Sequence, residues 1–209
     1  DTVYGDQLNM EPHEFYETMR NGELPKSMAN NPEVIRERFE KLLKEGKDIL
    51  HIAFSSALSG SCNNVMMTAN QLLEDYPERK IMVFDSLNAS LGEGVSVYRA
   101  VELWKEGRTM QEVYDILTEE RDHVNVSFTV NDLNHLQRGG RVSKTTAVVG
   151  SLVNIKTILT VTASGELKAD GTVRGRKKSL KTLVSRMEAA LETDSYGKDR
   201  MVAVLHGDC

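Results

Sequence analysis

A cluster of hydroxyl side chains stands out at residues 55–61, which read Ser55-Ser56-Ala57-Leu58-Ser59-Gly60-Ser61. An apolar run at residues 49–54 precedes it, and apolar residues at helical spacing follow it as far as Tyr76. This order predicts a buried strand, a polar turn and a helix. The helix would present unpaired N–H groups at the turn, and these favour an anion. The serines are equally typical of a plain capping turn, and the stretch is neither a phosphate loop nor a G-x-S-x-G turn.

A second polar loop follows the next predicted strand. Residues 81–84 are apolar and end in Asp85-Ser86, and residues 88–94 are small and contain glycine. Adjacent parallel strands end at the same edge of a sheet, so the two loops predict a shared polar notch, which Ser27 could also reach. Serine hydroxyls and backbone amides bind a carboxylate or a phosphate, but these loops supply no base for nucleophilic catalysis. The five histidines are scattered and show the spacing of neither a metal site nor a catalytic triad.

Two basic stretches allow two interpretations each. Arg138-Gly139-Gly140-Arg141 combines flexible backbone with two guanidiniums that could clamp an anion. On local grounds we favour a helix carboxyl end, where basic residues complement the helix dipole. The second stretch is either a solvated helix face or a docking patch for a partner, and the first is favoured; it comprises Arg174, Arg176, Lys177, Lys178 and Lys181.

The succession of elements predicts an α/β fold with two domains. Up to residue 123, strands alternate with helices, including a helix that begins at a Thr109–Glu112 capping box, and this predicts a parallel sheet covered by helices on both faces. Residues 124–209 are expected to form an α+β domain with a hairpin and a long amphipathic helix. We expect strands at residues 124–130, 155–162 and 201–205, a short helix capped by Ser143, and a hairpin turn at Asp170-Gly171.

Composition narrows the class of protein. The chain has 209 residues and a net charge of −5, which argues against nucleic acid as a partner. Its longest apolar runs are too short to span a membrane, and no signal peptide is evident. Cys62 and Cys209 form no metal-binding motif, and reduced thiols fit a cytoplasmic protein; Cys62 is either a buried spectator, which we favour, or a thiol activated by the nearby helix end. We expect segments to be missing at both ends.

Several motifs together resemble the bacterial DegV family. They are the serine turn at residues 55–61, Asp85-Ser86-Leu87-Asn88-Ala89-Ser90-Leu91-Gly92-Glu93-Gly94, Leu136-Gln137-Arg138-Gly139-Gly140-Arg141-Val142-Ser143, Leu152-Val153-Asn154-Ile155-Lys156-Thr157-Ile158-Leu159 and Gly175-Arg176-Lys177-Lys178. They follow one another in the order of the family. The resemblance implies the two-domain EDD fold of that family and a protein that binds a long-chain fatty acid such as palmitate, stearate or oleate.

The resemblance also assigns roles to individual residues. It implies that hydroxyls of Ser59 and Ser27 hold the fatty-acid carboxylate, with Gly60 and Ser86 completing the fatty-acid-binding set. Arg141, or in second place Arg138, would serve phosphoryl transfer near the entrance. The motif around Ser27 departs from the family, because only its first hydroxyl is present, as serine for threonine.

The function implied is that of a lipid-binding subunit with no catalytic residue, cofactor or metal of its own. It would present the carboxylate to a separate ATP-dependent kinase subunit, which makes the acyl-phosphate, and it allows transient contact with a membrane surface. One alternative is a phosphotransferase or esterase that acts through the serine-rich loops. Another is an interaction protein with a vestigial pocket, which the weakened motif around Ser27 would favour. The binding hypothesis predicts an elongated apolar cavity that opens beside Ser59.

Overall fold

A computed structural model describes residues 10–143, 154–193 and 201–208 of the chain. The chain divides into two compact units, one of residues 1–28 with 202–209 and one of residues 29–201. The division does not test the predicted domain boundary near residue 124, which stays a prediction. The expected helix after Ser143 lies outside the described residues. The helical pattern of residues 9–20 predicts a cap at Asn9, but the cap residue of that helix is Glu11.

The smaller unit contains helix α1 (Pro12–Arg20), which starts after Glu11 and has proline in its first turn. Two side chains of this helix bind the carboxylate of Asp208: His13 through Nδ1 at 2.9 Å and Arg20 through a terminal nitrogen at 2.8 Å. These hydrogen bonds, that of His13 first, lower the pKa of Asp208. The same hydrogen bonds hold Asp208 against α1.

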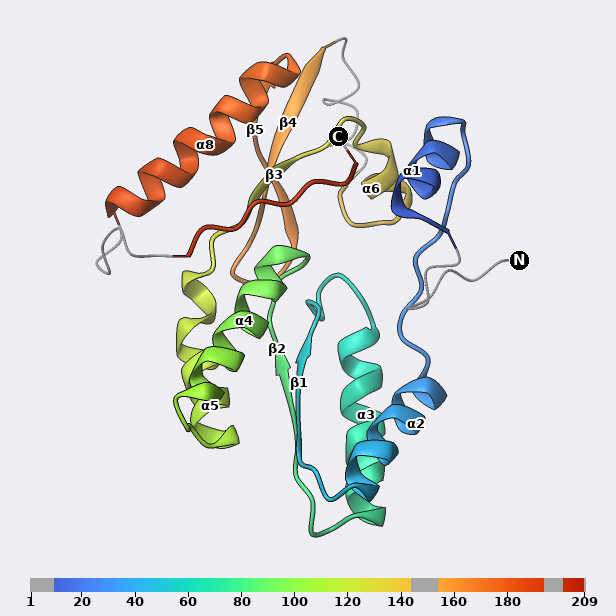
Figure 1. The fold of residues 1–209 in the computed structure, drawn as a ribbon. Helices are drawn as coiled ribbons and strands as arrows, with labels where there is room; N and C mark the ends of the chain where they lie inside the picture. The colour runs from blue at the N-terminus through green and yellow to red at the C-terminus, as the bar shows by residue number, and fades with distance from the viewer. Residues whose placement is uncertain (1–9, 144–153, 194–200, 209) are drawn as a thin grey trace. The chain divides into compact units, whose positions relative to one another are not determined.

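The larger unit contains the predicted parallel pair of strands, β1 (Ile49–Ala53) and β2 (Ile81–Asp85) (Figure 1). Alternate residues of β1 belong to different cores. Ile49 packs with α2 (Pro32–Lys44) and α3 (Ser61–Asp75), whereas Leu50 and Ile52 pack towards α4 (Leu91–Lys105) and α5 (Met110–Glu120). This strand is apolar on both faces because helices cover both faces of the sheet. The α/β/α arrangement predicted for this part of the chain is therefore confirmed.

Helix boundaries follow the capping signals in the sequence. Asn31 accepts a hydrogen bond from the Glu33 amide at the start of α2, and Thr109 and Glu112 form the predicted capping box of α5. A 3-10 turn, η1 (Arg121–His123), then leads out of α5. Each such cap contributes roughly 1 kcal/mol to helix stability.

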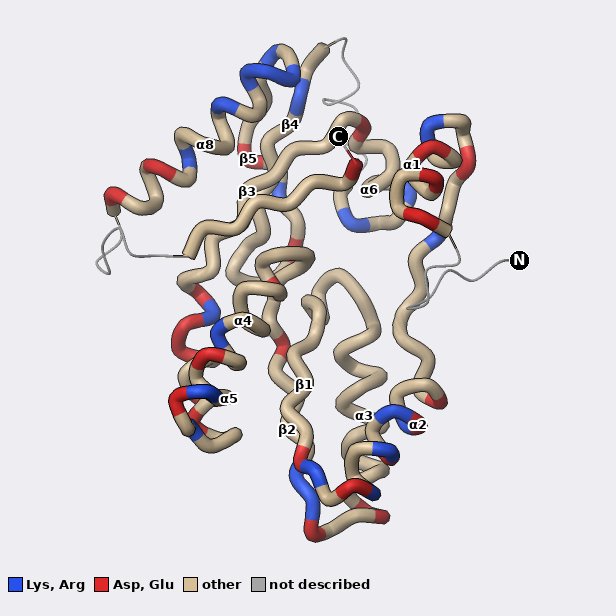
Figure 2. The backbone as a smooth tube through the Cα atoms, viewed as in Figure 1, with Lys and Arg blue, Asp and Glu red and all other residues tan. Residues whose placement is uncertain are grey.

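The second sheet is antiparallel, in the order β3-β4-β5, and consists of β3 (Ser127–Thr129), β4 (Ile155–Val161) and β5 (Leu167–Arg174). Leu159 and Leu167 pack in a small core with Leu133, which precedes α6 (Asn134–Arg138). Helix α8 (Arg176–Thr193) contacts all three strands. Most of its basic residues lie in its first half, although Arg186 lies in the second half with the acidic residues Glu188 and Glu192 (Figure 2).

Several details differ from the sequence-based expectations. The strand expected at 124–130 is limited to Ser127–Thr129. Asp170-Gly171 is not the hairpin turn, because both residues lie within β5. The pairing of β5 with β4 shifts in register there, opposite residues 157–159 of β4. Gly171 lies in this irregular part of β5 with a φ of +125°, a backbone conformation that favours glycine. The hairpin turn lies instead between Val161 and Leu167.

The strand expected at residues 201–205 is also absent from the described structure. This segment pairs with none of the described strands, and Val204 is 87% exposed. An apolar run forms a strand only when a neighbouring strand accepts its hydrogen bonds. In α8, Leu180 and Val184 belong to the apolar pattern of the helix but are exposed, whereas Leu183 and Met187 are half-buried.

Candidate functional site

The serine turn ends directly at the first residue of α3. The amide of Ser61 donates to Ser59 Oγ at 3.2 Å, and the two hydroxyl oxygens lie 3.0 Å apart. Ser61 Oγ also accepts from the amide of Asn30 at 3.1 Å, and Asn64 donates to the Asn30 carbonyl at 2.8 Å. The hydrogen bonds of Ser61 and Asn64 to Asn30 therefore hold the serine turn and the start of α3 against the segment that precedes α2.

The amino end of α3 has the character of an anion site. Gly60 occupies the cap position without a side-chain hydrogen bond, and the first turn of this 15-residue helix contains no acidic residue. The partial positive charge at the helix start is thus not compensated by the helix's own side chains. Ser59 is half-buried at this end and Gly60 is exposed, so a carboxylate or phosphate could approach both.

The second polar loop meets the serine turn, as the sequence predicts. The amide of Ser55 donates to the Asn88 carbonyl at 2.8 Å, and Asp85 Oδ1 accepts from the amides of Ser56 and Leu87 at 3.2 and 3.0 Å. Ser86 is fully buried, and its hydroxyl donates to the Ala53 carbonyl at 2.7 Å. Ser86 thus supports the ends of the two strands from beneath the loops.

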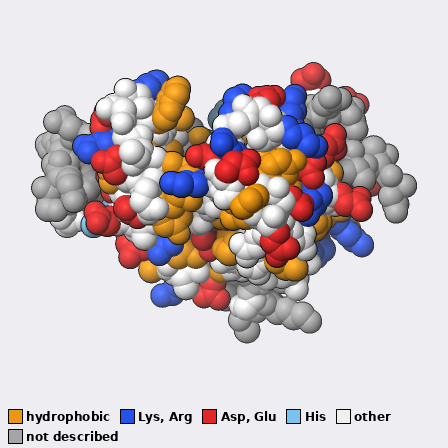
Figure 3. Space-filling view, turned by 90° about the horizontal axis from the view of Figure 1, so that it is seen from below, with side chains coloured by type: hydrophobic (Ala, Val, Ile, Leu, Met, Phe, Trp, Pro, Cys, Tyr) orange, Lys and Arg blue, Asp and Glu red, His pale blue; other side chains and the backbone are white. Residues whose placement is uncertain are grey.

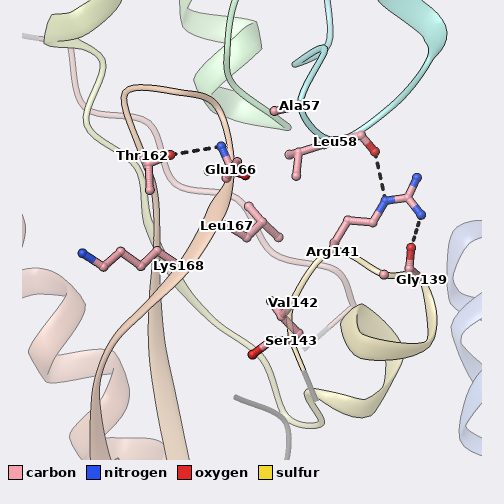
Figure 4. A pocket seen from close by; sticks show the side chains of 11 residues that line it. Ala57, Leu58, Gly139, Arg141, Val142, Ser143, Thr162, Glu166, Leu167 and Lys168 are labelled. Carbon is pink, nitrogen blue, oxygen red and sulfur yellow. Dashed lines mark hydrogen bonds between the residues drawn. The ribbon is translucent and has the colours of Figure 1, made fainter. Parts of the chain in front are cut away.

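The glycine-rich loop after α6 reaches the same place. Arg141 donates from Nε to the carbonyl of Leu58 at 3.0 Å and from a terminal nitrogen to the carbonyl of Gly139 (Figure 4). Gly139 caps α6, and Gly140 has a φ of +73° that favours glycine. The glycine-rich loop therefore ends helix α6, and it also places Arg141 beside the serine turn. Arg138 is bound to His135 at 3.0 Å in an exposed contact.

A cavity of about 510 Å³ lies where these loops meet the hairpin turn between β4 and β5. Figure 4 shows Leu58 and Leu167 on its two sides, with Arg141 at the edge that faces the serine turn. Its volume is in the range of small-molecule pockets. The lining mixes apolar and polar side chains, and the lining residues are Ala57, Leu58, Gly139, Gly140, Arg141, Val142, Ser143, Thr162, Glu166, Leu167 and Lys168.

The cavity differs from the elongated apolar one expected beside Ser59. Leu58 lines it, but Ser59 does not, and only part of its lining is apolar. The sequence also gave no indication that Thr162, Glu166 and Leu167 belong to this site. Residues 163–166 are recognisable as a turn, but a turn signal is local and does not say which distant loop the turn contacts.

The remaining predicted site residue, Ser27, belongs to the other unit and is exposed. Its role stays a prediction, as do those of Ser59, Gly60, Ser86, Arg138 and Arg141.

The described parts of the chain give no support for a metal site, a reactive thiol or a membrane-spanning helix. There, no group of three or more His, Cys, Asp or Glu side chains is placed to hold a metal ion. Cys62 is fully buried, and burial together with the nearby charge of Asp85 raises its pKa to about 11, so the spectator interpretation holds. None of the helices in the described ranges combines the length and apolarity needed to cross a membrane. On the face in Figure 3, charges of both signs are interspersed.

Comparison with known proteins identifies close relatives of the whole chain. A sequence model of the DegV family, described as an uncharacterised protein family, matches residues 1–209. A DegV domain-containing protein of Clostridium perfringens is 39% identical over 210 residues, which cover 100% of this chain and 71% of the relative.

Solved structures show the same fold. A DegV family protein from Thermus thermophilus, whose structure is described by its fatty-acid binding, matches with a TM-score of 0.79 and 31% identity over 92% of this chain and 67% of its own. The fatty acid kinase B3 protein of Streptococcus pneumoniae, loaded with linoleic acid, matches with a TM-score of 0.78 and 28% identity over 90% of this chain and 66% of its own. By these matches, and by the order of motifs around its serine turn, the chain belongs to the DegV family.

Proposed function

We propose that this protein binds a long-chain fatty acid, with the carboxylate at the amino end of α3. The observation that carries the proposal is the juxtaposition of an uncompensated helix start, which directly follows Ser59, with a cavity lined by Leu58. The solved relatives from Thermus thermophilus and Streptococcus pneumoniae bind fatty acids, which gives the anion its chemical class.

The head group would be held by neutral donors. Ser59 Oγ is within hydrogen-bond distance of Ser61 Oγ, so a carboxylate that accepts from Ser59 draws on a connected pair of hydroxyls. Gly60 allows close approach because it has no side chain. By the family resemblance, Ser27 would add a second hydroxyl, and Ser86 would hold the loop geometry.

The acyl chain would supply most of the affinity. Transfer of a chain of about sixteen carbons from water releases roughly 12 kcal/mol before the costs of binding, at about 0.8 kcal/mol per methylene. Leu58, Val142 and Leu167 offer the apolar part of the cavity for the first carbons of this chain. The charged side chains that line the cavity, those of Arg141, Glu166 and Lys168, would lie near the head group of the fatty acid.

We further propose that catalysis belongs to a separate ATP-dependent kinase, and that Arg141 assists the phosphoryl transfer, with Arg138 in second place. Arg141 is tied to the serine turn, where the carboxylate would lie, whereas Arg138 is engaged with His135. None of the serines in residues 55–61 and 85–94 is hydrogen-bonded to a histidine, so the esterase alternative lacks a nucleophile with a base. The fatty acid is the only ligand that the proposal requires, and the protein would work in the cytoplasm.

The test is to purify the protein, extract it with organic solvent and identify fatty acids by mass spectrometry, before and after addition of palmitate. We expect about one acid per chain, and no acyl-phosphate when the protein alone is given ATP and magnesium. Failure to retain any acid would reject the binding proposal. Acyl-phosphate formed without a kinase would reject the division of labour.

A further inference from the structure

The hydroxyl of Ser55 connects two loops that lie far apart in the sequence. Ser55 is fully buried at the end of β1, and its Oγ donates to the carbonyl of Gly165 at 2.9 Å, across 110 positions of the chain. Its own amide is bound to the carbonyl of Asn88 at 2.8 Å. The side chain is therefore held at a fixed place and presents one donor to the hairpin turn of the second sheet.

That turn is rigid and fits closely against Ser55. The amide of Gly165 donates to the Thr162 carbonyl at 2.8 Å, and the amide of Thr162 donates to the Glu166 carbonyl at 2.9 Å. Gly165 is buried with a φ of +81°, and a Cβ at this position would overlap Ser55 Oγ and lie 3.2 Å from Leu87. The turn can approach Ser55 this closely only because residue 165 is glycine.

The contact lies directly behind one wall of the cavity. Ala57 and Leu58 follow Ser55 by two and three residues, and Thr162, Glu166 and Leu167 flank Gly165, and all five line the cavity. The distance between the two loops is therefore set where Ser55 meets Gly165.

We propose that Ser55 is a positioning residue that controls how long the protein retains its ligand. This inference rests on the proposed function. Without the Ser55 hydroxyl, the buried carbonyl of Gly165 has no hydrogen-bond donor, and the turn would move outward to reach water. The wall formed by Glu166 and Leu167 would move with the turn, so that the cavity opens more often and the ligand leaves faster.

The experiment compares Ser55→Ala with a matched control, Ser179→Ala. Ser179 is also fully buried, and its hydroxyl donates to a backbone carbonyl, that of Arg176, at 2.8 Å, but it lies on α8 and does not line the cavity. Urea unfolding and stopped-flow release of a fluorescent long-chain fatty acid are measured for both. We expect both variants to remain folded, but release about 5- to 10-fold faster in Ser55→Ala only, as for a hydrogen bond of about 1 kcal/mol.

A second pair of variants tests the contact from the other side. Gly165→Ala is compared with Gly107→Ala, because Gly107 has nearly the same φ, +84°, with no atom within 4 Å of an added Cβ. Both variants strain the backbone, but only Gly165→Ala pushes against Ser55. We expect faster release in Gly165→Ala alone, and a smaller additional effect of Gly165→Ala when Ser55 is already alanine.

The outcomes separate the two proposals. Equal release rates in Ser55→Ala and Ser179→Ala overturn the positioning role while the binding function stands, as long as the unaltered protein retains the fatty acid. If Ser55→Ala does not fold, the comparison of Gly165→Ala with Gly107→Ala decides, and equal release rates in that pair overturn the role. If the unaltered protein binds no fatty acid, the proposed function itself fails.

Discussion

Arg141 and Leu58 are 83 positions apart in the chain, yet Nε of Arg141 donates to the carbonyl of Leu58 at 3.0 Å. The bond joins the glycine-rich loop after α6 to the serine turn before α3. Two motifs that the sequence shows separately are thus parts of one site, and the carbonyl at the centre of the serine turn is satisfied by a charged donor.

This relationship predicts that lysine cannot replace Arg141. Arg141→Lys keeps the positive charge but loses the directed Nε bond and the bond to Gly139, because an ammonium group is a compact donor on a flexible stem. We expect unfolding free energy, measured in urea, to fall by about 1–3 kcal/mol. Arg174→Lys is the control, since Arg174 is exposed, and it should change stability by less than about 0.5 kcal/mol. An equal effect of the two variants would show that the bond to Leu58 does not contribute.

Two glycines in the first turn of α4 should respond oppositely to alanine. A Cβ at Gly92 would lie 2.5 Å from Asn88 Oδ1 and 2.7 Å from Val126, whereas a Cβ at Gly94 meets its nearest neighbour, Leu91, at 3.3 Å. We expect Gly92→Ala to destabilise the protein by about 1–3 kcal/mol through overpacking. Gly94→Ala should be neutral or stabilise it by up to about 1 kcal/mol, through helix propensity. Thermal and urea unfolding give the comparison, and a stabilised Gly92→Ala would contradict the close packing of the second polar loop.

The thiol of Cys62 should be almost unreactive in the folded protein. Its pKa is raised to about 11 by burial and by the charge of Asp85, so only about one thiol in a thousand is ionised at pH 8. In a Cys209→Ser background, we expect a disulfide reagent such as DTNB to react at least 100-fold more slowly with the native protein than with the protein in urea. The native rate should rise as the pH rises towards 11, because the reactive thiolate then becomes populated. Comparable rates in the native and unfolded protein at pH 8 would show that Cys62 is accessible.

The elements that could be predicted from the sequence are those whose signals are local. The apolar run of β1 and the Thr109–Glu112 box each depend on residues within one or two turns, and both are confirmed. The same holds for the meeting of the two polar loops, because parallel strands bring their carboxyl ends together. The family resemblance predicted the fold class in more detail than these local patterns did.

The features that could not be predicted depend on partners far away in the chain. Asp170-Gly171 has the composition of a hairpin turn, but the register against β4 makes it a bulge. Residues 201–205 have the composition of a strand, but they pair with none of the described strands. The turn that brings Thr162 and Glu166 to the cavity also meets Ser55 through Gly165, and no periodicity in the sequence records such a contact.

The central claim, that the serine turn recognises a carboxylate at the head of an acyl chain, is tested most directly by comparing palmitate with hexadecanol. The two ligands have the same chain length and differ in the head group, so the ratio of their dissociation constants isolates head-group recognition. In the unaltered protein we expect palmitate to bind at least about 10-fold more tightly, since hydrogen bonds to a charged group contribute about 1.5–3 kcal/mol. Ser59→Ala should remove most of this preference, whereas Ser127→Ala, at an exposed position of β3, should preserve it. Equal binding of the two ligands, or a preference that survives in Ser59→Ala, would contradict the account.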